Sequence, residues 1–412
     1  MIRNRGGSKA GAPPKCGSFS EPRGRRRAPV SAALTSLLLL VALASLGSCA
    51  SLSQGARSGG PGVTPPPSFH LLDRDADYAA LGIDRHVVAP REDGRRSPAD
   101  SRHFEWWYFD ALLEDGTTIV AWFGDNWPFG IGARTVSLEI TPAGGTTERW
   151  FGSYREKGSF GTDRADVRIG PHSFSGNLVD YHIFIDPAAT GGQGIDLNLH
   201  GTVAAWRPAS GVIAEGDDYF AWLAAVPEGE VSGSVTVEGA TRQVRGSGYH
   251  DHNWGNISPA ALMDSWWWGR ATVGGHTVIA SELRAAQDRG GGGAPLLFVG
   301  SPAGLDKEAW SSSQVEVIEG PPMRHPDPRH PRTIASWVRY STADGFVATF
   351  PVTDRMITST DLLDGQSPLI VGFARAFGLK PWYSRFLSPV SLALPGKEPQ
   401  VAPGTLEYFE FR

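Results

Sequence analysis

Residues 272–279 read Thr-Val-Gly-Gly-His-Thr-Val-Ile, and this stretch decides the expected fold class. Alternating polar and apolar residues flank Gly274 and Gly275, and two glycines between such segments are typical of a two-residue turn between antiparallel strands. The same alternation recurs at residues 231–237, Val-Ser-Gly-Ser-Val-Thr-Val, and at residues 195–199, Ile-Asp-Leu-Asn-Leu. Because alternation gives a strand one apolar face, the pattern predicts half-buried β-strands rather than helices.

Turn signals recur at short intervals along the rest of the chain. Asp115-Gly116 and Asp344-Gly345 stand between strand-like runs, and the 51 glycines and 31 prolines are spread rather than clustered. Helical periodicity is scarce by comparison. Many short strands separated by turns are typical of sandwiches and barrels. About 340 residues follow the leader and the Ser-, Gly- and Pro-rich stretch described below, which is enough for two domains, so we predict an all-β protein of antiparallel sheets.

The first 48 residues have the pattern of an export signal rather than of a folded domain. A basic segment that ends at Arg27 precedes an apolar run from Val30 to Leu46, and Gly and Ser lead to Cys49. This order is typical of secretory signals, and a cysteine after Leu-Gly-Ser resembles a bacterial lipobox. We interpret residues 1–48 as a signal peptide of the lipoprotein type and expect a lipid on Cys49. An ordinary signal peptide and an uncleaved membrane anchor are the alternatives.

Charge and composition limit the classes of binding partner that are expected for the mature chain. Residues 49–79 begin with a Ser-, Gly- and Pro-rich stretch that is expected to tether the folded part to a membrane. The full chain has a net charge of −5, and loss of residues 1–48, with eight Lys or Arg and one Glu, would leave −12. Such a surface repels phosphate backbones, so nucleic acid is not an expected partner. The expected location is the cell envelope, as a periplasmic or outer-membrane lipoprotein.

Tryptophan is the most conspicuous feature of the composition, because many of the 14 residues gather in two groups. Trp106 and Trp107 belong to the first group, and Trp254 with residues 266–268 forms the second. Successive strand residues point to opposite faces, so Trp106 and Tyr108 can share an interior that Trp107 does not reach. An aromatic-walled cavity would suit an elongated apolar ligand or a cation formed in a reaction. Plain core packing is the alternative for any single tryptophan.

The densest mixture of reactive side chains is at residues 246–255, Gly-Ser-Gly-Tyr-His-Asp-His-Asn-Trp-Gly. On an extended strand, His250, His252 and Trp254 would share one face. Tyr249, Asp251 and Asn253 would share the other. Imidazoles held by carboxylates can act as acid and base. Two histidines could also bind a metal, but no third and fourth ligand can be named, so no metal is assigned. The alternative is a buried polar network that joins two domains.

Two segments resemble the signatures of the carotenoid 1,2-hydratase (hydroxyneurosporene synthase, CrtC) and AttH family. Residues 104–109, Phe-Glu-Trp-Trp-Tyr-Phe, are similar to the N-terminal signature, and residues 248–255 are similar to the second one. The spacing between them is also similar, as are Trp-Trp-Trp-Gly-Arg at 266–270 and the closing residues 404–411. The resemblance extends over residues 80–412, which is most of the chain.

The resemblance implies two lipocalin-like antiparallel β-barrels in tandem, with a ligand site near their junction. We place the first barrel at residues 80–255 and the second at residues 256–412. One departure concerns the reaction. The hydratases carry a Tyr and an Asp on the strand after the second signature, whereas residues 276–283 contain no Tyr, and Glu282 is the nearest acid. Carotenoid hydration itself therefore does not follow from the resemblance.

Two functions of different classes are predicted. The first is a lipid-anchored protein that binds a hydrophobic small molecule, such as an isoprenoid, a polyene or a lipid. The second is a cofactor-independent hydratase or cyclase, in which a buried acid protonates a double bond, aromatic faces stabilise the cation and water adds. No cofactor is expected in either case. The predicted catalytic residues are His252, His250, Asp251 and Glu105. The predicted ligand-binding residues are Trp106, Tyr108, Tyr249, Trp254 and Trp267. All are expected to line or brace one apolar pocket.

Overall fold

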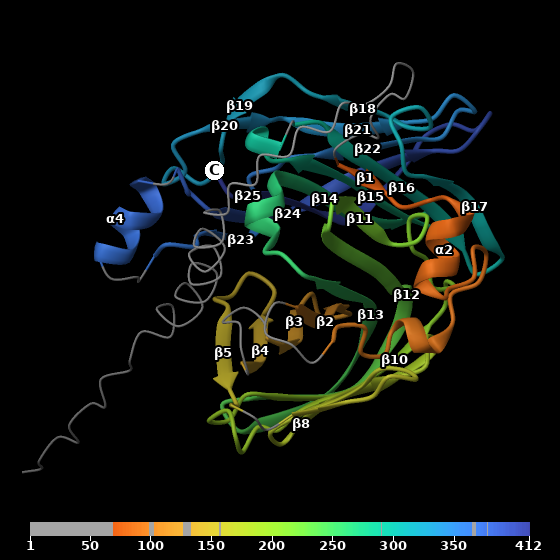
Figure 1. Cartoon of the computed structure of the whole chain (residues 1–412). Coiled ribbons are helices and arrows are strands. Elements are labelled where there is room, and N and C mark those ends of the chain that lie inside the picture. The colour runs from red at the N-terminus through yellow and green to blue at the C-terminus, as the bar shows by residue number, and fades with distance from the viewer. Residues whose placement is uncertain are drawn as a thin grey trace, which may run out of the picture.

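The structure is a computed structural model that describes residues 69–98, 103–126, 133–155, 158–289, 291–364, 368–376 and 378–412. The predicted signal peptide, Cys49 and the tether up to residue 68 lie outside the described residues. Most of the described chain is strand, in two large antiparallel sheets that each curl into a half-barrel (Figure 1). This arrangement confirms the predicted all-β fold of two tandem barrels. Across the described part of the chain, no helix has the length and apolar character needed to cross a membrane.

The first sheet has thirteen strands and ends at Gly255. Its main path runs β5-β4-β3-β2-β13-β12-β10-β9-β8-β7-β6, and β11 pairs with both β12 and β1. The strands are β1 His70–Leu71, β2 Phe104–Leu113, β3 Thr118–Asp125, β4 Arg134–Thr141, β5 Glu148–Ser153, β6 Gly158–Phe160, β7 Asp166–Ile169, β8 His172–Gly176, β9 Asp180–Ile185, β10 Gly194–Gly201, β11 Val212–Glu215, β12 Asp218–Val237 and β13 Ala240–Gly255.

The second sheet has ten strands and begins at Met263. Its main path runs β17-β16-β15-β14-β25-β24-β22-β21-β18, and β23 pairs with β24. The strands are β14 Met263–Val273, β15 His276–Ala285, β16 Gly293–Ser301, β17 Gly304–Ala309, β18 Glu316–Glu319, β21 Trp337–Ser341, β22 Val347–Pro351, β23 Met356–Asp361, β24 Trp382–Ala393 and β25 Gln400–Glu410. A separate two-stranded sheet pairs β19 Pro322–Arg324 with β20 Thr333–Ala335.

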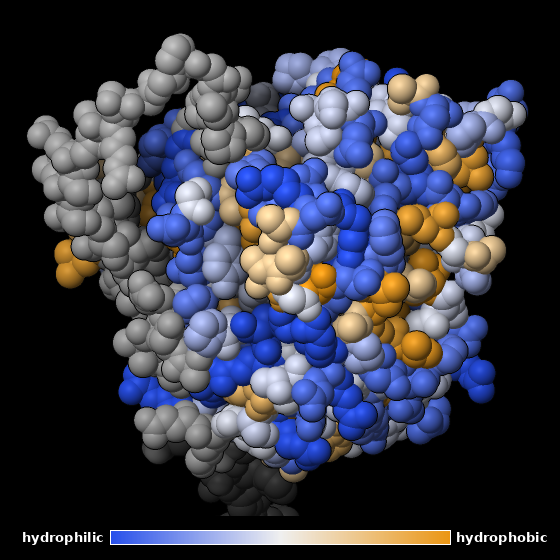
Figure 2. Space-filling view, turned by 45° about the vertical axis from the view of Figure 1, so that its right-hand side comes forward, coloured by the Kyte–Doolittle hydropathy of each residue, from blue (hydrophilic) through white to orange (hydrophobic). Residues whose placement is uncertain are grey.

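Helices are few and short in the described residues. The α-helices are α2 Asp75–Leu81, α3 Pro259–Leu262 and α4 Pro368–Ala376, and the 3₁₀ helices are η1 Pro90–Glu92 and η2 Gln287–Arg289. The connection between the two sheets contains only α3. On the face in Figure 2, hydrophilic residues predominate and apolar residues form small groups.

The predicted tether is wrong at its C-terminal end. Within the predicted range of 49–79, β1 pairs with β11, and α2 begins at Asp75. Phe69 and Leu71 are buried in the core between the sheets, and Tyr78 is buried as well. A two-residue strand is too short for alternation to reveal it, because its pairing depends on a partner far away in the sequence.

The predicted hairpin is present, with Val273 opposite His276 across the turn. Gly274 and Gly275 have φ values of +60° and +83°, which a residue with a Cβ atom adopts only at a cost. Alternation along the strands also agrees with the sequence, since the apolar residues at 195, 197 and 199 are all buried. The local pattern therefore predicted both the turn and the inward face.

Alternation places the apolar side chains in three cores. One core fills the concave side of the first sheet and contains Trp107 and Phe109. Another fills the second sheet and contains Trp267 and Phe350. The third lies between the sheets and combines residues of both, such as Phe220. This third core surrounds the cavity described below.

Candidate functional site

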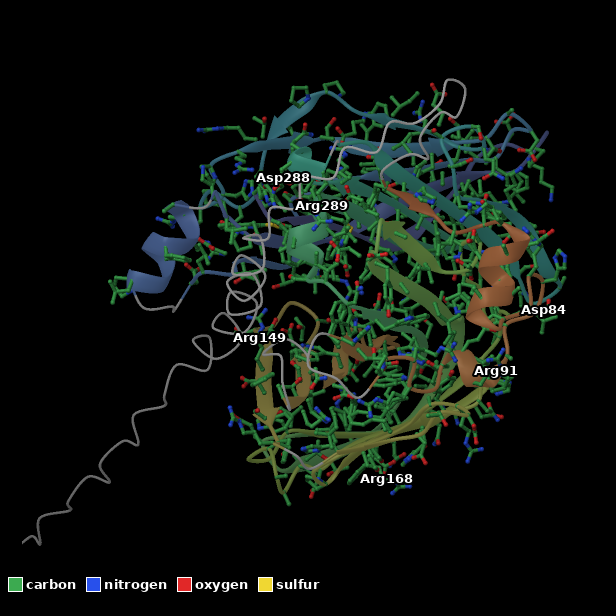
Figure 3. The ribbon with its side chains drawn as sticks, in the orientation of Figure 1. Asp84, Arg91, Arg149, Arg168, Asp288 and Arg289 are labelled. Atoms are coloured by element: carbon green, nitrogen blue, oxygen red, sulfur yellow. The ribbon has the colours of Figure 1, made fainter. Side chains whose placement is uncertain are left out.

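A cavity of about 660 Å³ lies between the two sheets, and residues of both sheets line it. Arg149 on β5 joins the sheets at this cavity, because its Nη2 atom donates to the Thr358 hydroxyl on β23 at 2.9 Å (Figure 3). Aromatic side chains are the most numerous group in the lining, and charged, hydroxyl-bearing and aliphatic side chains lie among them. The aromatic lining residues are Trp106, Tyr108, Trp122, Phe220, Trp222, Tyr249, Trp266, Trp268, Tyr383, Phe409 and Phe411.

The first sheet contributes residues of β3, β4, β5 and β12 to the lining, as well as residues of β2 and β13. Strands β2 and β13 carry the predicted site residues among them. They are antiparallel neighbours, with Trp106 opposite Asn253 and Tyr108 opposite Asp251. Because strand residues alternate between faces, these four side chains and Tyr249 point to the same side and line the cavity. Four predicted site residues, Trp106, Tyr108, Tyr249 and Asp251, therefore lie together at one wall.

Asp251 is the carboxyl group of this wall. Its Oδ2 atom accepts hydrogen bonds from the Tyr249 hydroxyl at 2.9 Å and from Trp222 Nε1 at 3.1 Å. Its Oδ1 atom accepts one from the Asn253 amide at 2.7 Å. Burial raises the pKa of Asp251 to about 6, although its hydrogen-bond donors favour the charged form. A carboxyl group that titrates near neutral pH beside an apolar cavity can exchange a proton with a bound molecule.

Glu407 on β25 is the carboxyl group of the opposite wall, which belongs to the second sheet. Its Oε1 atom lies 3.3 Å from Arg385 Nε, and Tyr383 makes a side-chain hydrogen bond to it. Burial raises the pKa of Glu407 to about 7, and the Arg385 charge opposes that rise. Two carboxyl groups with raised pKa values therefore face one aromatic cavity.

A buried ion-pair network ties the two walls together. Asp110 on β2 lies 2.7 Å from Arg270 on β14 and 2.5 Å from Arg385 on β24. Arg270 also lies 2.9 Å from Glu228. Burial favours the neutral form of Asp110, but the two guanidinium groups hold its pKa below the usual value. The network joins the two sheets, and its Arg385 also lines the cavity.

The comparisons with known proteins bear on this two-sheet arrangement. No family model matches the chain. An AttH protein of Nitrosomonas europaea has a similar structure, with a TM-score of 0.52 and 14% identity over 78% of this chain and 96% of that one. The chain has the AttH-type two-barrel fold. CghA, solved with Sch210972, shares the fold with a TM-score of 0.55 and 12% identity over 84% of this chain and 99% of that one.

Two curated proteins match parts of this chain. A quinolone epoxide rearrangement protein of Emericella nidulans is 25% identical over 195 residues, which are 43% of this chain and 53% of that protein. A hydroxyneurosporene dehydrogenase of Chlorobaculum tepidum is 42% identical over 55 residues, which are 12% of this chain and 14% of that protein. The chain thus spans about half the length of the first of these relatives. The resemblance to the CrtC and AttH family stands at the level of this fold.

The other predicted catalytic residues lie on the opposite face of the first sheet of the AttH-type fold. His250, His252 and Glu105 are fully buried inside the first barrel and do not line the cavity between the sheets. The Trp107 ring stacks on His252 at 4.5 Å, and the Trp254 ring lies 4.9 Å from it. The expectation of one common pocket is therefore corrected, because alternation along β2 and β13 divides the predicted residues between two faces.

This second group binds the segment that precedes β2. His252 Nε2 lies 2.8 Å from Glu105 Oε1. The Glu105 carboxylate also accepts hydrogen bonds from the backbone N–H groups of Arg96 and Ser97, at 2.6 and 3.1 Å. His250 Nε2 lies 3.2 Å from both carboxylate oxygens of Asp93. These contacts form a buried polar network within the first barrel, rather than the network between two domains that was named above as the alternative to catalysis. Within the described ranges, no group of three or more His, Cys, Asp or Glu residues is placed to hold a metal ion.

Two predicted ligand-binding tryptophans also lie elsewhere. Trp254 lines a smaller cavity of about 290 Å³, together with Leu81 and Tyr219. Trp267 is buried in the core of the second sheet, where its indole N–H donates to Glu319 at 2.6 Å. Its neighbours at 266 and 268 line the larger cavity instead. Trp267 therefore does not line the larger cavity, because a shift of one position along a strand reverses the face.

The sequence prediction did not include Glu407, Arg385 or Tyr383. A signal was present, because Glu407, Phe409 and Phe411 alternate along the closing segment, and all three line the cavity. An acid among alternating aromatic residues indicates a polar group on an apolar face. Arg385 and Tyr383 alternate in the same way on β24, but no local feature shows that the two strands meet the first sheet.

Proposed function

We propose that this protein binds a hydrophobic small molecule, such as an isoprenoid, a polyene or a lipid, in the cavity between the two sheets. The observation that carries the proposal is the lining of eleven aromatic side chains. The cavity volume of about 660 Å³ lies within the range of small-molecule sites. Aromatic faces favour flat, unsaturated molecules, and the few polar groups would orient a single polar end of the ligand.

A second candidate is a cofactor-independent enzyme that acts on the molecule so bound, and the raised pKa of Asp251 favours it. The names of the two relatives, which concern a quinolone epoxide rearrangement and hydroxyneurosporene, support chemistry on unsaturated molecules. In this function, an acid adds a proton to a double bond, aromatic rings stabilise the cation, and water adds before it loses a proton to a base. The net reaction is the addition of one water molecule.

We further propose that the protein is a lipoprotein of the cell envelope, anchored through Cys49. The lipobox-like sequence before Cys49 supports this location. Cys49→Ser should release the protein from the membrane fraction, and a fatty-acid analogue should label the wild type but not the variant. Equal labelling of both proteins would exclude the lipid anchor without affecting the cavity proposal.

Calorimetric titration with a polyene, a fatty acid and an isoprenoid alcohol tests ligand binding. At least one of them should bind the wild type. Trp106→Ala should weaken that binding by about 1–3 kcal/mol, because a cavity-lining aromatic face is lost. Trp254→Ala is the matched control, since Trp254 lines the smaller cavity. If none of the three ligands binds, or if both variants lose affinity equally, the cavity is not the binding site.

A further inference from the structure

The cavity holds an acidic group that the sequence did not predict, and it faces the acidic group that the sequence did predict. Asp251 on β13 and Glu407 on β25 come from different sheets and line the same space. An aromatic residue lies beside each of the two acids, and these two aromatic residues contact each other. The Tyr249 hydroxyl donates to Asp251, and the Tyr249 ring lies 5.2 Å from the Trp268 ring. Trp268 in turn pairs with Glu407 between β14 and β25.

A second set of contacts connects the two carboxyl groups on their polar side. Tyr108 lies opposite Asp251 in the pairing of β2 with β13, and its hydroxyl accepts a hydrogen bond from Arg385 at 3.0 Å. Arg385 also lies beside Glu407. The two acids are therefore parts of one constellation rather than of two separate sites.

We propose that Glu407 is the proton donor of this cavity and that Asp251 is the base that receives a proton from water. The proposal rests on the enzymatic function proposed above and names a residue for each role. The substrate class is an apolar molecule with an isolated carbon–carbon double bond, because the walls are aromatic around the two acids.

The donor must be neutral and the base must be charged, and the two carboxyl groups have different hydrogen-bond and ion-pair partners. Asp251 accepts three hydrogen bonds, from Tyr249, Trp222 and Asn253, and such donors favour a carboxylate. Glu407 has one guanidinium group beside it, that of Arg385, which also serves Asp110 at 2.5 Å. Burial is the largest influence on both groups, and it raises the pKa of Asp251 to about 6 and that of Glu407 to about 7.

The groups that face Glu407 come from three strands besides its own. Arg385 and Tyr383 on β24 favour its charged form. Asp110 on β2 and Asp251 on β13 oppose that form by like-charge repulsion. An ionised Asp251 therefore keeps the proton on Glu407, so each acid supports the role of the other.

The proposed step balances in atoms and electrons. Glu407 transfers its proton to one carbon of the double bond, which forms a C–H bond and leaves a cation on the other carbon. Water forms a C–O bond to that cation, and its surplus proton passes to Asp251. Transfer of a proton from Asp251 back to Glu407 restores the starting state. The reaction needs no oxidant or reductant.

Infrared pH titration of the full chain tests the assignment without any ligand, since a neutral carboxyl group absorbs apart from a carboxylate. The wild type should show a neutral carboxyl band that persists to about pH 7. Glu407→Gln should remove the component of the band that titrates near pH 7 and leave the component of Asp251 near pH 6. Asp251→Asn should leave the band but shift its titration to lower pH, because a neighbouring negative charge is lost. Glu282→Gln is the control, because the Glu282 side chain on β15 is more exposed and pairs with Arg284. This variant should change neither the band nor its titration.

Farnesol in deuterium oxide tests the chemistry. The wild type should form a hydrated product with one carbon-bound deuterium, and Glu407→Gln should lower the rate by about 100-fold or more while farnesol still binds. Glu407→Asp should restore part of the rate. A component near pH 7 that survives in Glu407→Gln overturns the assignment of the donor. Bound farnesol that gains no deuterium in the wild type overturns it as well, but leaves the binding proposal intact.

Discussion

At the scale of single residues, neighbours on β13 belong to different parts of the molecule. Asp251 faces the cavity between the sheets, whereas His250 and His252 face the interior of the first barrel. The two-residue period of a strand separates them, although they are adjacent in sequence. Chemical resemblance among neighbouring residues is therefore a weak guide to a common site on a strand.

His252→Ala should lower the stability of the fold and leave cavity binding unchanged. The variant loses the stacking with Trp107 at 4.5 Å and leaves Glu105 with fewer partners. Together these losses should cost about 2–4 kcal/mol in chemical denaturation. Ligand affinity should change by less than about two-fold, because the cavity lies on the other face. Loss of binding at unchanged stability would instead place His252 in the functional site.

Asp110→Ala should be among the most destabilising single changes in the ion-pair network between the two sheets. It leaves Arg270 and Arg385 buried without the carboxylate that they share. Removal of one partner from a buried ion pair costs about 3–5 kcal/mol. Asp180→Asn is the control, because the ion pair of Asp180 with His200 is exposed and should contribute little. Similar denaturation midpoints for the two variants would show that the network does not hold the sheets together.

At the scale of elements, a hairpin turn and a set of buried hydrogen bonds determine where the strands lie. The hairpin between β14 and β15 brings Trp266 and Trp268 to the cavity wall. The segment that includes η1 is held inside the first barrel by the carboxylates of Asp93 and Glu105. Both features act on the site from a distance, because they set the position of the strands that carry it.

Gly275→Ala should destabilise the hairpin, whereas Gly372→Ala should stabilise a helix. Gly275 has φ +83° and open space around its Cα, so backbone strain is the only cost of a side chain there. That cost should be about 1–2 kcal/mol in a denaturant titration. Gly372 lies within α4, and a Cβ atom would also meet open space. Alanine there should slow amide exchange of α4, since glycine weakens helices by about 0.5–1 kcal/mol. Equal effects of the two changes would contradict the turn geometry.

The buried pair of His250 and Asp93 should make the stability of the fold depend on pH. Burial alone would lower the pKa of His250, but the Asp93 carboxylate and hydrogen bonds raise it above the ordinary value. The contribution of this pair is therefore complete below about pH 6.5 and is lost as the pH rises through the raised pKa. Asp93→Asn should lower the melting temperature more at about pH 5.5 than at about pH 9. An equal loss at both values would show that His250 stays neutral.

At the scale of the whole molecule, the two sheets share the core that surrounds the site. Phe220 of the first sheet and Phe409 of the second belong to this same core. Burial of each such side chain contributes about 1.5–3 kcal/mol, so the sheets stabilise each other. The cavity is consequently a property of the pair rather than of either barrel.

Neither half of the chain should be stable and soluble alone. Residues 69–255 and 256–412, produced separately, would each expose the apolar face that forms the shared core. We expect strong binding of a hydrophobic dye or aggregation of each half, and a soluble complex when both are produced together. Two well-folded monomeric halves that bind no dye would show that the shared core contributes little.

Features that depend on local periodicity could be predicted without a structure. Alternation and paired glycines predicted the all-β class, the hairpin at 272–279 and the division of residues 249–254 into two faces. Which of the two faces meets the cavity depends on how the two sheets dock, and no local pattern shows it. For the same reason Glu407 meets Asp251 across more than 150 residues, and Arg385 reaches Asp110 across 275. Local patterns specify which side chains share a face, whereas long-range packing specifies what that face contacts.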